Sequence, residues 1–200
     1  MNPNINELLD RIRQLEEEIE QEIQRHRAAL HADFEHRRIR FSREIMAQQR
    51  RFKTGLLQYL MSAKLRNIVT APLIYSVFFP LLLLDVFVTL YQYLCFPLYG
   101  IARVRRRDYL VFDRIHLAYL NLIEKINCAY CSYGTGLIAY VMEVISRTEQ
   151  YWCPIKHARR IRHIHSRYSE FVDYGDAEAY RRELQTLREK LNKLTDGSKE

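Results

Sequence analysis

The sequence lacks the short motifs that identify most soluble enzymes. It has only 6 glycines in 200 residues and contains no glycine-rich phosphate loop, nucleophile elbow or HExxH helix. It also lacks an apolar leader, because residues 1–30 are largely charged, so we expect the chain to stay on the cytoplasmic side. The patterns of RRM, KH and zinc-finger domains are missing as well, which argues against nucleic acid as a partner.

Cysteine is also scarce. The chain has Cys95, Cys128, Cys131 and Cys153, and without a secretory leader we expect their thiols to remain reduced. Acidic residues are fewer than basic ones, 24 against 31, and the net charge is +7. Such a charge suits nucleic acid, anionic lipid or simple solubility, so the positions of the basic residues decide between them.

Basic residues flank the one long apolar block of the chain. Each would gain roughly 1 kcal/mol beside an anionic leaflet, so we predict that they contact lipid headgroups. They are Arg50, Arg51, Lys53, Lys64 and Arg66 before the block, and Arg103, Arg105, Arg106 and Arg107 after it.

The apolar block itself, residues 68–102, contains a single charge, Asp85. As one straight helix it would be roughly 50 Å long, against about 30 Å of bilayer hydrocarbon. Pro80 divides it, so we expect a half-inserted hairpin that returns both basic flanks to the cytoplasm. The alternatives, in order, are a full hairpin turning at Asp85 and a single span.

Asp85 would be costly in lipid unless it is neutral, paired or at a wet apex. We expect a structural or oligomer-contact role for this carboxylate, with ion or proton binding as the alternative. The two terminal helices carry apolar residues at alternating spacings of three and four, which is typical of a coiled-coil seam. The seams comprise Ile5, Leu8, Ile12, Leu15 and Ile19 at one end, and Tyr180, Leu184, Leu187, Leu191 and Leu194 at the other.

Further helices are expected between these features. A basic helix over 34–67 would lie on the membrane surface. Helices over 108–127 and 137–152 would be separated by a break at Gly134 and Gly136. Two later helices would begin at Pro154 and, capped by Asp176, run to Gly197.

One group of side chains suggests chemistry: Cys128, Cys131, Cys153 and His157. Three thiols and an imidazole form a competent tetrahedral zinc set, and iron or an iron–sulfur cluster would use the same ligands. Cys153 at the N-cap of a helix from Pro154 would favour the thiolate. A fully helical 137–152 would, however, carry Cys153 about 24 Å away from the CxxC pair. A redox dithiol and inert cysteines therefore remain alternatives.

The segment HARRIRHIH, residues 157–165, offers arginines to lipid headgroups or to a phosphate-bearing ligand, with His163 and His165 as replacement metal ligands. The motifs CxYCSYxxG and RTEQYWCPIKHA, together with the apolar block, resemble an uncharacterised family of bacterial membrane-associated proteins. The resemblance covers roughly residues 65–160. It implies a bacterial membrane setting and no catalytic residues.

These features predict an all-α, membrane-associated protein in four segments: a helical arm (1–66), the inserted hairpin (67–102), a Cys/His-containing cytoplasmic domain (103–170) and a coiled-coil-like helix (171–200). The predicted function is a scaffold or adaptor on the inner face of the cytoplasmic membrane, with both termini in the cytoplasm. Its partners would be lipid and a helical protein or a second copy of the chain. The alternative is a membrane-surface metal- or thiol-dependent enzyme built on the Cys/His group.

Overall fold

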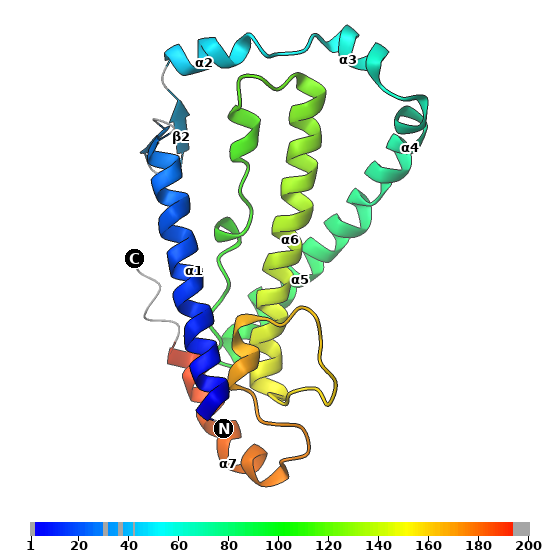
Figure 1. The fold of residues 1–200 in the computed structure, drawn as a ribbon. Helices are drawn as coiled ribbons and strands as arrows, with labels where there is room; N and C mark the ends of the chain where they lie inside the picture. Colours follow the sequence, from blue (N-terminus) through cyan, green and yellow to red (C-terminus); the bar gives the residue numbers. More distant parts are fainter. Residues whose placement is uncertain (1–2, 30–31, 36–37, 42, 194–200) are drawn as a thin grey trace. The chain divides into compact units, whose positions relative to one another are not determined.

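A computed structural model describes residues 3–29, 32–35, 38–41 and 43–193. Helices dominate them, as predicted, and a single two-stranded antiparallel hairpin pairs Ala32 with Phe41. The elements are α1 (Pro3–Ala29), β1 (Ala32–Glu35), β2 (Arg38–Phe41), α2 (Arg43–Arg50), α3 (Leu56–Ser62), α4 (Leu65–Ser76), α5 (Phe78–Leu98), α6 (Leu122–Trp152) and α7 (Ala177–Lys193) (Figure 1). Short 3-10 turns lie at Arg106–Asp108, Asp113–His116 and Ser166–Glu170.

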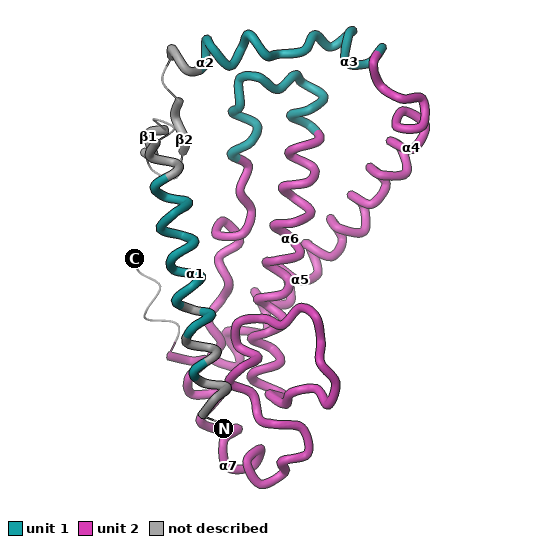
Figure 2. Tube along the Cα trace, viewed as in Figure 1, with its two compact units in different colours: residues 1–61, 113–126 teal, residues 62–112, 127–200 magenta. Residues whose placement is uncertain are grey.

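The chain forms two compact units (Figure 2). The first contains residues 1–61 and 113–126, and the second contains residues 62–112 and 127–200. The single helix expected over 34–67 is wrong: β2, α2 and α3 occupy this stretch instead. Residues Arg51 to Gly55 separate α2 from α3, and a glycine favours a break at such a position.

The apolar block does not fold back on itself. Val77, between α4 and α5, has helical dihedrals (φ −61°, ψ −19°), and the helical run from Leu65 to Leu98 is 34 residues long. The hairpin prediction is therefore wrong. Pro80 is the third residue of α5, where the backbone N–H has no helical acceptor, so proline there costs no hydrogen bond and begins a helix.

The region after the block also differs from expectation. Residues 108–121 are not an α-helix, and α6 is one unbroken helix from Leu122 to Trp152. The Asn121 side chain accepts a hydrogen bond from the N–H of Glu124 (3.0 Å), whose carboxylate accepts one from the N–H of Asn121 (2.8 Å). This reciprocal capping box starts the helix at that point.

Gly136 does not break α6. A Cβ atom at this position would lie 2.6 Å from the carbonyl oxygen of Tyr109 and 3.1 Å from Leu110 Cδ2. The glycine therefore allows the backbone of residues 109–110 to lie directly on the helix. Sequence reasoning misread this long-range contact as a local break.

In the second unit, α5 and α6 run parallel. Contacts advance along α6 and along the run formed by α4 and α5, from Tyr75 of α4 with Asn127 through Thr89 with Tyr140 (3.3 Å) to Tyr91 with Thr148 (2.9 Å). Because the two helices point the same way, the chain that connects the end of α5 to the start of α6 must run back along their length. Residues 99–112, which we call the return segment, lie along the helices in the opposite direction, as Figure 1 shows.

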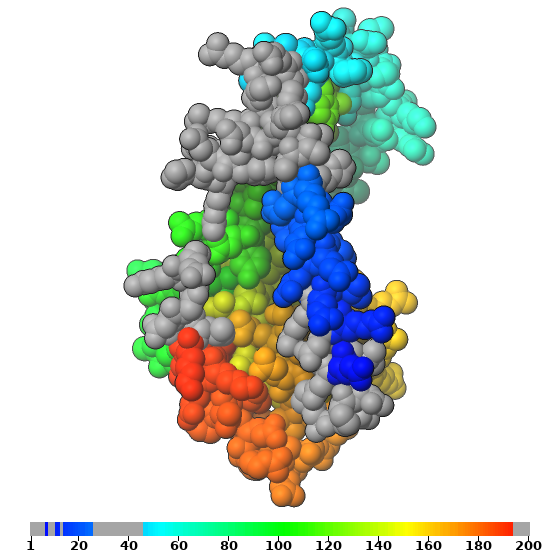
Figure 3. All heavy atoms as spheres, turned by 60° about the vertical axis from the view of Figure 1, so that its left-hand side comes forward, coloured from blue at the N-terminus to red at the C-terminus, as the bar shows by residue number. Residues whose placement is uncertain are grey.

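α7 begins where predicted. The side chain of Asp176 accepts a hydrogen bond from the N–H of Ala179 at 2.8 Å, which is an N-cap. Its apolar seam packs within the chain, because Leu187 and Leu191 are buried and the Leu187 carbonyl accepts a hydrogen bond from Gln150 (2.9 Å). Figure 3 shows α7 against the preceding segment. The expected end of this helix, near Gly197, and Leu194 lie outside the described residues.

Candidate functional site

Asp85 is buried at the centre of a polar network between α5, α6 and the return segment. Its carboxylate accepts hydrogen bonds from the hydroxyls of Tyr133 (2.8 Å) and Thr89 (3.3 Å). It also forms an ion pair with Arg106. Only 3% of the residue is exposed, so the negative charge is compensated by a cation and two hydroxyl donors rather than by water.

Arg106 was predicted to contact lipid headgroups, and the structure gives it a different partner. Its side chain is 46% exposed, yet its guanidinium donates to Asp85. A buried carboxylate attracts a nearby guanidinium more strongly than water-screened lipid phosphates do. The sequence left three options open for Asp85, a neutral carboxyl, a pairing or a wet apex, and it did not identify Arg106 as a partner.

The network continues along α5 to Gln92, which is also buried. Its carboxamide oxygen accepts a hydrogen bond from the backbone N–H of Val104 (3.0 Å), and its amide group donates to the carbonyl of Val104 (3.4 Å) and to the hydroxyl of Tyr140. Asp85, Thr89 and Gln92 recur at spacings of four and three, which places them on one face of the helix. This polar stripe in an apolar helix was a readable signal that sequence reasoning missed.

A second network lies toward the C-terminal end of α6. Glu143 binds both Arg147 and Arg167 at 2.8 Å, and Arg147 also donates to the carbonyl of Ala102 at 2.6 Å. Because all three ionic side chains are less than one-fifth exposed, loss of one partner would leave a largely dehydrated charge. This network joins α6 to the return segment and to the turn at Ser166–Glu170.

His165 belongs to the same region. Its Nε2 lies 3.0 Å from a carboxylate oxygen of Glu149, and its ring packs against Tyr168 and Phe171. Its other ring nitrogen, Nδ1, is buried without a hydrogen-bond partner among the described residues. The sequence offered His165 as an alternative metal ligand. In the structure, Glu149 is the one described side chain beside it that could serve as a second ligand.

The structure does not bring the predicted metal ligands together. Cys128 and Cys131 lie on α6, whereas Cys153 follows its last residue, so the two positions are about 33 Å apart along the helix from Cys131. His157 stacks on Tyr168 beyond the helix end. Within the described residues, no three His, Cys, Asp or Glu side chains are placed to hold a metal ion.

The expected helix N-cap at Cys153 is also wrong. The N–H of Cys153 still bonds to the carbonyl of Glu149 (2.8 Å), and the chain then leaves α6 in an extended path. Ile155 pairs with Val172 in a parallel bridge. Pro154 therefore ends a helix instead of beginning one, because it has no N–H with which to continue the ladder.

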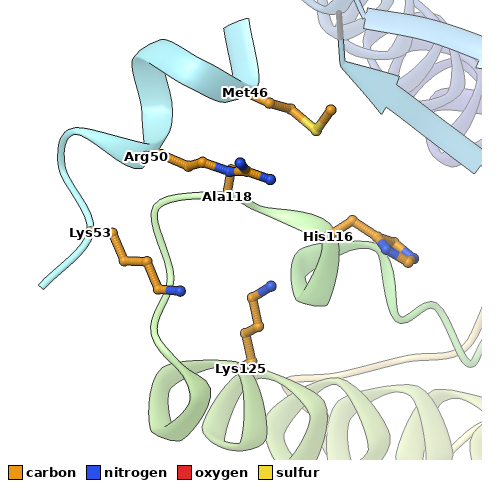
Figure 4. Close-up of a pocket in the computed structure, with 6 residues that line it drawn as sticks. All are labelled: Met46, Arg50, Lys53, His116, Ala118 and Lys125. Atoms are coloured by element: carbon orange, nitrogen blue, oxygen red, sulfur yellow. The ribbon is translucent and has the colours of Figure 1, made fainter. Parts of the chain in front are cut away.

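The first unit contains a basic hollow of ≈ 440 Å³ (Figure 4). Arg50 and Lys53, which were predicted to meet lipid headgroups, lie on one side of it. His116 and Lys125, which the sequence did not single out, lie on the other. The hollow is lined by Met46, Arg50, Lys53, His116, Ala118 and Lys125.

The remaining basic residues of the flanks are exposed. Arg51, Lys64 and Arg66 precede or begin α4, and Arg105 and Arg107 lie in an exposed stretch of the return segment that follows the buried Val104. Arg103 lies over the ring of Tyr93, 4.5 Å from its centroid. Comparison of the whole chain with protein-family models, with characterised proteins and with solved structures finds no match.

Proposed function

We propose that this protein is a helical scaffold embedded in one leaflet of a membrane, held by the apolar surfaces of α4, α5 and α6. The observation that carries the proposal is the exposed apolar surface of two helices long enough to cross a membrane. Only 11% of the most apolar window of residues 65–98 is buried within the protein. Such a surface would be unfavourable in water, since burial of apolar area is worth roughly 25 cal/mol per Å².

The exposed side chains of α5 form one continuous stripe. They lie on the side away from Asp85, Val88 and Gln92, which face the protein interior. The stripe consists of Phe79, Leu82, Leu83, Val86, Phe87, Leu90 and Leu94.

On α6 the exposed stripe lies opposite the return segment. Ile138, Met142 and Ile145 are exposed, whereas Gly136 and Tyr140 face residues 109–110. Two positions along an α-helix are about 200° apart around its axis, so Ile138 and Met142 point away from Gly136 and Tyr140. One side of α6 is thus apolar, and the other carries the arginine-rich segment.

This arrangement favours insertion in one leaflet over two full spans. Because α5 and α6 are parallel, two spans would require the return segment to cross the bilayer with its exposed arginines. Each arginine at the bilayer centre costs about 2.5–3.5 kcal/mol on insertion scales. With the helices in one leaflet, Arg103, Arg105 and Arg107 remain at the headgroups while the apolar stripes meet the acyl chains.

The scaffold role is supported by α1. Its described apolar side chains Ile12, Leu15, Ile19 and Ile23 are 39–60% exposed and flanked by glutamates. Those of Ile5 and Leu8 lie outside the described part of the structure. An exposed seam of this kind is suited to pairing with another helix, from a partner protein or a second copy.

The membrane arrangement can be tested by cysteine labelling. Single cysteines replace Lys64 and Arg107 in a chain whose native cysteines are changed to serine, and the protein is reconstituted in vesicles. We expect both positions to react with a membrane-impermeant maleimide from the same side, because both would lie at one leaflet. A cysteine at Glu178 is the water-exposed control, and a cysteine at Leu90 is the lipid-facing control. Labelling of positions 64 and 107 from opposite sides would refute the proposal.

A further inference from the structure

The hollow of Figure 4 gathers cations from two separate stretches of the first unit. Arg50 is the last residue of α2 and Lys53 follows it, whereas His116 ends a 3-10 turn and Lys125 lies in the first turn of α6. Figure 4 shows the side chains of Arg50, Lys53 and Lys125 extending into the same space.

The two stretches are joined by a defined contact. The backbone N–H of Ala118 donates to the side-chain oxygen of Gln49 at 3.4 Å. This bond lies beside the hollow and keeps α2 next to residues 116–118. The capping box of Asn121 with Glu124 fixes the first turn of α6, and with it the position of Lys125. The cations are therefore held together by local structure.

None of the described side chains that line the hollow is acidic. The ion pairs formed by the described residues involve none of Arg50, Lys53, His116 and Lys125. Like charges that face a common space repel one another, and a bound anion would remove this cost. Arg50 supplies a planar fork of donors and the two lysines supply compact charges, a combination that suits tetrahedral phosphate oxygens.

We propose that this hollow binds the phosphate group of a phosphomonoester, from either a lipid headgroup or a small soluble metabolite. A phosphomonoester carries close to two negative charges at neutral pH and offers three acceptor oxygens, more than a carboxylate does. The volume of ≈ 440 Å³ leaves room for a group attached to the phosphate. The described part of the lining contains no aromatic ring on which a nucleic-acid base would stack.

Calorimetric titration of the full-length protein in neutral detergent tests the site without any membrane. The probe is glycerol 3-phosphate, with inorganic phosphate in a parallel titration. We expect saturable binding that weakens roughly tenfold or more in K53Q/K125Q, because two charge-assisted contacts are lost. The matched control is R181Q/K193Q, which removes two exposed cations from α7 and should change binding by less than about twofold.

A second variant covers the possibility that the lysines are needed for folding. Ala118→Glu leaves every cation in place and introduces a carboxylate into the hollow, so it should also abolish binding, with the circular dichroism spectrum unchanged. If the wild-type protein binds neither soluble probe and gains no flotation when phosphatidic acid is added, or if R181Q/K193Q weakens binding as much as K53Q/K125Q does, the proposal is wrong.

Vesicle flotation distinguishes the two sources of phosphate. Phosphatidylcholine vesicles are compared with and without phosphatidic acid. A gain in flotation with phosphatidic acid that K53Q/K125Q abolishes, without binding of the soluble probes, supports a lipid ligand. Binding of glycerol 3-phosphate with no such gain supports a soluble ligand. Failure to float with either vesicle would overturn the membrane proposal while leaving the soluble-phosphate result intact.

Discussion

Gly136→Ala should destabilise the second unit, whereas Gly134→Ala, two residues away in the same helix, should stabilise it. A Cβ at position 136 would lie 2.6 Å from the backbone oxygen of Tyr109 and 3.1–3.2 Å from two atoms of Leu110. At position 134 the nearest atom would be Leu81 Cδ1 at 3.6 Å, an ordinary contact. The two glycines therefore differ in their surroundings and share the same backbone conformation.

The size of the effect follows from two opposing terms. Replacement of a helical glycine by alanine gains about 0.5–1 kcal/mol in either case. At Gly136 the new methyl group must also displace the return segment, and overpacking of this kind costs about 1–3 kcal/mol. Since the helical gain is common to both variants, the difference between them isolates the overpacking cost. It should correspond to roughly 2–12 °C in Tm for a chain of this size.

The measurement is thermal unfolding followed by circular dichroism at 222 nm, with both variants and the parent protein in the same detergent. Gly136→Ala should unfold below the parent and Gly134→Ala above it. If the two variants unfold at the same temperature, the return segment does not lie against α6 at residues 109–110.

Two further predictions concern ion pairs. Asp85→Asn should lower the free energy of unfolding by about 1–3 kcal/mol, which is less than for a fully buried pair because Arg106 can be rehydrated. In the double variant D85N/R106Q, the loss of stability should be smaller than the sum of the two single losses. Full additivity would contradict the pairing. The Lys156 ammonium, through its hydrogen bond and charge, lowers the pKa of Asp173 below its ordinary value of 3.8. Because its pKa is lower in the folded than in the unfolded state, Asp173 stabilises the fold at pH values above its unfolded-state pKa. This stabilisation is lost as the pH falls through the folded-state pKa. Asp173→Asn should therefore lower the free energy of unfolding by about 0.2–1 kcal/mol at pH 7 and leave it unchanged near pH 2, as measured by urea unfolding. An equal loss at both pH values would exclude the ion pair as its source.

The apolar character of residues 68–102 and the cap of α7 were predictable because both depend on local sequence. The continuous helical path through Pro80 was not, because a proline followed by leucines is equally suited to a turn and to the first turn of a helix. The start of α6 could have been predicted from Asn121 and Glu124, which match the spacing of a capping box. Gly136 was assigned to a loop because the contact that requires it comes from residues 109–110, distant in sequence.

The metal hypothesis depended on the same misassignment. A break at Gly134 and Gly136 would have allowed the chain to fold back, although a helical 137–152 would still have separated Cys153 from the CxxC pair by about 24 Å. In a continuous helix of 31 residues, the separation is determined by the rise per residue. The four ligands could then meet only if they came from different copies of the chain.

The polar network explains why α5 is not simply apolar throughout. If α5 had apolar residues in place of Asp85 and Gln92, it would offer the return segment no side-chain hydrogen-bonding partner. Gln92 binds the backbone of Val104 in both directions, and Asp85 holds Arg106 two residues further along. These contacts keep the segment against the helices, so that Arg103, Arg105 and Arg107 project from one side. In the one-leaflet arrangement that we propose, these arginines would limit how deeply the protein inserts, because deeper insertion would bring them into hydrocarbon.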